Sequence, residues 1–97
     1  GFFVSLGMEI KTKVMTQEQV MTALELVRVK VVGTTEEFGI GKGGIWISAE
    51  DTPSLFNYWS EEWVDTFGVK PELDKFIEAC GWYFEWYDTG TMMVWPN

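Results

Sequence analysis

The side chains best placed to do chemistry in this chain are the carboxylates of its second half. The first 49 residues carry five acids and five bases and are neutral, whereas the remainder holds ten acids and two lysines, which accounts for the whole net charge of −8. Pairs such as Glu61 with Asp65, or Glu50 with Asp51, have a spacing at which two carboxylates can hold a hard cation or divide the roles of acid and base. No twelve-residue calcium loop surrounds either pair, so a solvated surface is the better interpretation.

Two absences limit the chemistry further. The chain has no histidine, and Cys80 is its single cysteine. The commonest metal ligand and the commonest general base near neutral pH are therefore missing, and no intramolecular disulfide can form. We expect a non-enzymatic protein without a cofactor or a metal, in which Cys80 serves as a small buried hydrophobe. Because no apolar run approaches 20 residues, we also expect a cytoplasmic protein with no membrane partner.

Two short motifs match functional signatures by composition alone. Gly39 to Gly44 fit G-x-G-x-x-G, but a dinucleotide site needs a strand before this motif and a helix after it. Here a β-rich run follows, which favours an exposed, mobile loop. Asp88-Thr89-Gly90 resembles the active-site triplet of the aspartic proteases, yet only seven residues follow Gly90, whereas that family places the triplet early. We interpret the triplet as a hairpin turn in which Gly90 supplies a positive φ.

The aromatic residues are as unevenly distributed as the charges. Twelve of the sixteen rings, including five of the six tryptophans, lie after residue 49. Phe56, Trp59, Trp63 and Phe67 recur at helical steps, which predicts a stripe that packs into a core together with Phe76. The rings between Trp82 and Tyr87, together with Trp95, exceed what one face of a sheet can bury, so we expect part of them on the surface.

Local signals predict the elements that carry these residues. Alternation predicts a strand over 9–14, a capping box at Thr16 predicts the start of a helix, and a glycine-rich loop covers 34–44. Further along, the pattern predicts a strand at 45–47 and a helix from Pro53 that ends near Gly68. It also predicts a short helix that begins at Pro71, with Gly81 as the residue beyond its C-cap, and a hairpin of 82–87 with 91–95. The segment 26–32 fits both a continuation of the first helix to Gly33 and a strand, and the helical period favours the helix narrowly.

These elements predict one small α+β domain over residues 1–97, with residues 1–7 as a leader or an expression remnant. Its antiparallel sheet should carry helices on one face and end in the C-terminal β-hairpin. A ferredoxin-like arrangement is the variant if 26–32 is a strand.

The leading functional hypothesis is a small acidic binding or regulatory protein that associates with itself, or with another protein, through an aromatic surface. Direct contact with nucleic acid is disfavoured, because a phosphate backbone would meet a strongly acidic half-molecule. One alternative is a mimic of nucleic acid that occupies the site of a DNA- or RNA-binding protein, and another is a small-ligand binder or a carboxylate-based enzyme. The predicted partner-binding residues are Trp82, Phe84, Trp86, Trp95, Glu61, Glu62 and Asp65.

Overall fold

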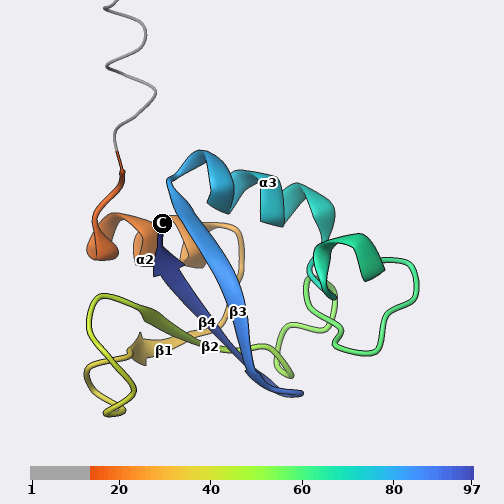
Figure 1. Cartoon of the computed structure of the whole chain (residues 1–97), viewed down its shortest axis with the longest axis horizontal. Coiled ribbons are helices and arrows are strands. Elements are labelled where there is room, and N and C mark those ends of the chain that lie inside the picture. Colours follow the sequence, from red (N-terminus) through yellow and green to blue (C-terminus); the bar gives the residue numbers. More distant parts are fainter. Residues whose placement is uncertain (1–13) are drawn as a thin grey trace, which may run out of the picture.

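The protein is an α+β domain, and in its described part, residues 14–97, two helices cover one face of a four-stranded antiparallel sheet (Figure 1). The computed structural model describes residues 14–97, so the predicted strand over 9–14, apart from Val14, and the predicted leader lie outside the described residues. The elements are α2 (Gln17–Leu26), β1 (Val31–Thr34), β2 (Ile45–Ser48), the 3-10 turn η1 (Val64–Thr66), α3 (Pro71–Ala79), β3 (Trp82–Asp88) and β4 (Thr91–Pro96).

The order of the strands in the sheet is β1-β2-β4-β3, with every neighbouring pair antiparallel. The predicted fold class is therefore confirmed, including the C-terminal hairpin. The ferredoxin-like variant is wrong for the described residues, because two strands follow α3 and β4 lies between β2 and β3, whereas a single strand follows the second helix in that arrangement.

Helix α2 begins as predicted but ends seven residues before Gly33. The Thr16 hydroxyl accepts a hydrogen bond from the Gln19 amide (3.2 Å), and the Gln19 side chain accepts one from the Thr16 amide (2.9 Å), which completes the capping box. At the other end Arg28 adopts a left-handed conformation (φ 72°), and the Val29 amide donates to the Leu24 carbonyl (3.0 Å). This is a Schellman motif, so the prediction of a long helix is wrong and the strand alternative holds for 31–34.

The predicted helix from Pro53 to Gly68 does not form. Turns occupy this segment, and the short η1 is its only helical element. Thr52 does not act as a helix N-cap here, because its hydroxyl accepts from the Lys30 amide (3.3 Å) and donates to the Ser48 carbonyl (3.4 Å). The threonine thereby fastens the start of the segment to the first hairpin.

The two faces of the sheet differ in what covers them. The face toward the helices carries the core residues Trp82 of β3, Val94 and Met92 of β4, and Ile45 and Ile47 of β2, with Phe84 partly buried against them. Across the strands Phe84 is opposite Val94, Val94 is opposite Ile45, and Met92 is opposite Ile47. Within residues 14–97, no helix lies over the other face (Figure 1). We call it the open sheet face. Its rings are Phe38, Trp46, Tyr83, Tyr87 and Trp95.

Candidate protein-binding loop

The segment that replaces the predicted helix is a closed loop, residues 57–68, which we call the tryptophan loop. Phe56 and Val69, both buried, form an isolated β-bridge at its base. Beside that bridge the Asn57 amide donates to the Gly68 carbonyl (2.7 Å), and the Lys70 amide donates to the Leu55 carbonyl (2.8 Å). A loop of this length with its ends paired is an Ω-type loop, a kind of segment that frequently carries function.

Side chains of the tryptophan loop hold its backbone in place. The Asn57 carboxamide oxygen accepts from the Trp59 amide (3.0 Å), and the Ser60 hydroxyl accepts from the Trp63 amide (3.0 Å). The Gly68 amide then closes the second half by donating to the Trp63 carbonyl (2.9 Å). Asparagine and serine side chains that bind nearby amides in this way compete with helix formation, which explains why the helical spacing of the rings does not produce a helix.

The fixed backbone presents large apolar side chains to water. Trp59 is 76% exposed, Phe67 is 80% exposed and Val64 is also exposed. The Phe67 backbone is left-handed (φ 54°), a conformation that costs a bulky residue about 1–2 kcal/mol. Strain of this kind persists where the surrounding structure enforces it, often at functional sites. The exposed rings of Trp59 and Phe67 contradict the prediction that they pack into the core.

A chain of rings connects the exposed Trp59 with the core. Successive centroid distances are 5.5 Å from Phe84 to Phe56, 6.4 Å from Phe56 to Trp86, 5.2 Å from Trp86 to Tyr58 and 5.0 Å from Tyr58 to Trp59, all with edge-to-face geometry. The Trp86 indole also donates to the Phe67 carbonyl. A hollow of about 360 Å³ lies beside these rings. Its lining consists of Tyr58, Ser60, Val64, Phe67, Gly68 and Trp86. The loop is therefore supported from β3.

The charge of this surface is negative. Glu61, Glu62 and Asp65 are exposed within the tryptophan loop, and no basic residue occurs between Ser54 and Val69. Three further acids, Glu72, Asp74 and Glu78, follow on α3. Partial burial, and then the nearby Glu78 carboxylate, raise the pKa of Asp74. The exposed rings thus lie in an acidic surrounding.

The structure divides the predicted site residues among three places. Glu61, Glu62 and Asp65 lie in the tryptophan loop, and Trp86 supports that loop from beneath. Trp82 is buried in the core, and Phe84 is partly buried against it. Trp95 lies on the open sheet face, where its indole donates to Glu85 (2.9 Å). The exposed apolar residues of the loop that the sequence did not predict as candidate contacts are Trp59, Val64 and Phe67. The available signal was the turn chemistry of Asn57, Ser60 and Gly68.

The glycine loop is held by hydrogen bonds within the chain. The Glu36 carboxylate accepts from the Gly43 amide (2.9 Å) and from Gln17 (3.1 Å), and these bonds lower the pKa of Glu36. The buried Thr35 hydroxyl accepts from the Gly44 amide and donates to the Gly41 carbonyl, both at 3.0 Å. The Gly43 amide, which a bound phosphate would need as a donor, is therefore already hydrogen-bonded to a carboxylate of the protein. Strand β2 follows the loop, as predicted.

The Asp88 triplet forms the turn of the C-terminal hairpin. The Asp88 carboxylate accepts from the Gly90 amide (2.9 Å), and Asp88 pairs with Thr91 across the turn. Gly90 does not adopt a positive φ, so that detail of the prediction is wrong. The turn is stabilised by the hydrogen bond to the Asp88 carboxylate and does not require a positive φ at Gly90.

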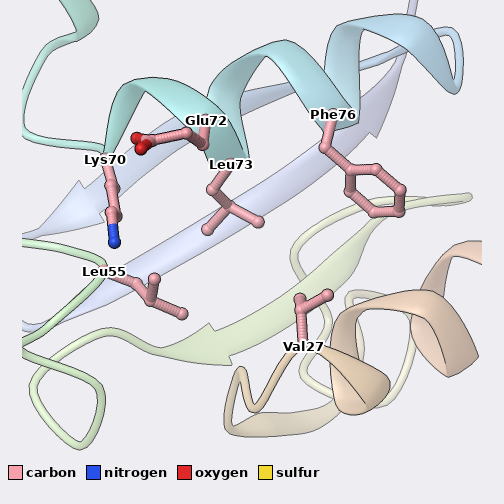
Figure 2. Close-up of a pocket in the computed structure, with 6 residues that line it drawn as sticks. All are labelled: Val27, Leu55, Lys70, Glu72, Leu73 and Phe76. Atoms are coloured by element: carbon pink, nitrogen blue, oxygen red, sulfur yellow. The ribbon is translucent and has the colours of Figure 1, made fainter.

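An apolar pocket of about 300 Å³ lies between α3, the end of α2 and the segment that precedes the tryptophan loop. Figure 2 shows Leu73 and Phe76 pointing from α3 toward Leu55 and Val27, with Lys70 beside Leu55. Cys80, near the end of α3, is buried as predicted, and burial raises the pKa of its thiol. Among residues 14–97 no group of side chains is arranged to hold a metal ion, and no helix is long and apolar enough to cross a membrane.

Comparisons with protein-family models, with curated proteins and with solved structures give no significant match to this chain.

Proposed function

We propose that this protein is a non-enzymatic binding protein and that the tryptophan loop inserts into an apolar, basic-rimmed groove of another protein. The observation that carries the proposal is the exposure of Trp59 and Phe67 on a loop whose backbone is closed by hydrogen bonds. Tryptophan and other aromatic residues dominate the energy of protein interfaces. A preformed loop loses little conformational entropy on binding, so more of the burial energy contributes to affinity.

The acids of the loop favour binding to a different protein over self-association through this surface. In a symmetric dimer the same patch meets itself, which would bring Glu61, Glu62 and Asp65 close to their own copies. Like charges facing each other across an interface oppose association, whereas lysine or arginine around a groove would be attracted. The acids also steer a basic partner toward the loop, and this contribution falls as salt is raised.

Affinity capture from cells of the source organism tests this proposal, with Trp59→Ala and Phe67→Ala compared against Leu26→Ala. Leu26 is a matched control because it is 77% exposed and lies on α2, away from the loop. We expect one protein to be retained by the wild type and by Leu26→Ala, and to bind at least tenfold more weakly to either loop variant, as truncation of a hot-spot residue does.

Two results would contradict the proposal. A partner bound equally by the wild type and by Trp59→Ala would remove the loop from the interface. A complex that weakens steeply with salt but ignores both ring substitutions would point instead to mimicry of nucleic acid by the acids.

Self-association is a second candidate function, and the open sheet face favours it. Phe38 stacks on Trp46 (centroids 5.1 Å apart), and Trp46 meets Tyr87 edge-on (4.7 Å). No helix of the described part of the chain covers these rings. Sedimentation of the wild type at tens of micromolar tests this function. A strict monomer would contradict it.

A further inference from the structure

Three aromatic rings line the hollow of about 360 Å³ beside the tryptophan loop, and we call this hollow the aromatic pocket. Tyr58 and Phe67 come from the loop, and Trp86 comes from β3. The planes of Tyr58 and Trp86 are 82° apart and their centroids are separated by 5.2 Å, so the two rings form walls that meet nearly at a right angle. Several rings around one hollow are the arrangement of an aromatic cage, in which a cation lies against more than one π-system.

The position of Trp86 is fixed by contacts within the chain. Its indole N–H donates to the Phe67 carbonyl, and its ring meets Phe56 edge-on at a centroid distance of 6.4 Å. Gly68 packs directly against the indole, because an added Cβ at this glycine would lie 3.2 Å from the Trp86 Cζ2 atom. The wall is therefore preformed, and a preformed site loses little conformational entropy when a ligand binds.

The aromatic pocket offers few hydrogen-bonding side chains. The Trp86 indole is already bonded to Phe67, and the hydroxyl of Ser60 already accepts from the Trp63 amide (3.0 Å), which leaves the Tyr58 hydroxyl as the other polar group of the lining side chains. A bare ammonium has three N–H donors, and burying such donors without acceptors is costly. A quaternary ammonium keeps the charge and has no N–H group, so this lining favours the methylated cation.

The charge around the aromatic pocket also favours a cation. Glu61 follows the lining residue Ser60, Asp65 follows the lining residue Val64, and both acids are exposed. Neighbouring Cα atoms are about 3.8 Å apart and the Debye length at physiological salt is about 8 Å, so salt does not fully screen these carboxylates from the pocket. No basic side chain among the described residues lines the pocket, and Lys70 lines the apolar pocket of Figure 2 instead.

We propose that the aromatic pocket is a cage that binds a quaternary ammonium group, supplied by a trimethylated lysine of the protein partner. Aromatic cages of this kind recognise methylated lysine and choline through cation–π attraction. The assignment to a lysine rests on the proposed function, which places a basic partner at the tryptophan loop, whereas the site itself does not depend on it. A lysine at the rim of the partner's groove would lie next to the pocket, because Tyr58 contacts both Trp86 and the exposed Trp59.

Titration of the full chain with small probes, followed by NMR of the tryptophan indole signals, tests the site. Choline is compared with neohexanol, its neutral carbon isostere, and with ethanolamine, which carries the charge without the methyl groups. We expect choline to bind at least tenfold more tightly than either probe, and to shift the indole signal of Trp86 but not that of Trp82, which is buried in the core. Equal binding of choline and neohexanol, or of choline and ethanolamine, would overturn the proposal.

Matched variants assign the binding to the rings of the aromatic pocket. Tyr58→Leu removes one wall and keeps an apolar side chain, whereas Tyr58→Phe keeps the ring. Tyr83→Leu is the control, because Tyr83 is exposed to a similar extent (41%, against 45% for Tyr58) but lies on the open sheet face. We expect the affinity for choline to fall about fivefold or more in Tyr58→Leu, and to change less than about twofold in Tyr58→Phe and Tyr83→Leu. Unchanged affinity in Tyr58→Leu would exclude the cage.

A second titration identifies the source of the group. The probes are the acetyl amide of trimethyl-lysine and the acetyl amide of unmodified lysine. We expect the trimethylated probe to bind at least tenfold more tightly than the unmodified one, and at least as tightly as choline. Binding of choline without binding of the trimethylated probe would overturn the assignment to a protein partner and point to a free small molecule.

The outcome of these titrations is separable from that of the capture experiment, because no partner is present in them. If choline does not bind but capture still requires Trp59, only the cage is contradicted. If choline binds but capture ignores Trp59 and Phe67, the proposed function and the lysine assignment are contradicted, and the cage is retained.

Discussion

Replacing Gly68 with alanine should destabilise the protein by about 2–4 kcal/mol, because two separate costs add at this position. Gly68 has a φ of +87°, and forcing alanine into such a conformation costs about 1 kcal/mol. An added Cβ would also lie 2.5 Å from the Asn57 carbonyl oxygen, which is backbone and cannot rotate away. Relief of that overlap requires the base of the tryptophan loop to open, at a cost of about 1–3 kcal/mol.

Gly43→Ala is the matched control for this perturbation. Gly43 has almost the same φ, +88°, but an added Cβ would meet nothing within 4 Å. Only the conformational cost of about 1 kcal/mol applies there. Urea unfolding followed by tryptophan fluorescence measures both variants, and the difference between their free energies of unfolding isolates the contact with Asn57. Equal losses in the two variants would show that the loop is not closed at Gly68 and would refute the reasoning for a preformed binding loop.

Two further predictions concern the ends of α2 and the flank of α3. Arg28→Gly should stabilise the protein by about 0.5–1 kcal/mol in urea unfolding, because glycine adopts the left-handed conformation of the Schellman motif without steric cost. A loss of stability would contradict this account of how α2 ends. Asp74→Asn should raise stability at pH 7 by a few tenths of a kcal/mol. Because the folded-state pKa of Asp74 is raised, the wild type should gain stability as the pH falls through that pKa, and the variant should lack this gain.

The elements with strong local signals could be predicted from the sequence. The capping box at Thr16, the proline and glycine that bracket α3, and the turn between β3 and β4 each depend on residues close together in the chain. The end of α2 was less predictable because Arg28 holds a position that usually belongs to glycine. Gly33, which looked like the helix end, pairs with Trp46 in the sheet instead.

The candidate site could be predicted only in part, because a helical period of rings has two physical explanations. In 53–67 the period predicts the buried stripe of a helix, yet local hydrogen bonds to the Asn57 and Ser60 side chains turn the chain and leave Trp59 and Phe67 in water. The acids of the loop could be predicted to lie on the surface, where the structure has them, because charged side chains are rarely buried in any fold. Strand alternation predicts that Trp82 and Trp86 lie on the opposite face of the sheet from Trp95. Which of the two faces the helices cover could not be predicted, because it depends on contacts between distant segments.

The exposed apolar side chains of the tryptophan loop lower stability and promote aggregation, and the acids of the same loop oppose that aggregation. Leaving Trp59, Val64 and Phe67 in water forgoes roughly 1.5–3 kcal/mol of burial energy for each side chain, a large share of the 5–15 kcal/mol that stabilises a typical domain. Unprotected apolar patches of this kind promote aggregation. Glu61, Glu62 and Asp65 are exposed in the same loop. In the proposed function they repel further copies of this patch, which leaves the burial energy available for a partner of opposite charge. Neutralising them as Glu61→Gln, Glu62→Gln and Asp65→Asn removes the repulsion while leaving the rings in place, and this surface should then become self-adhesive.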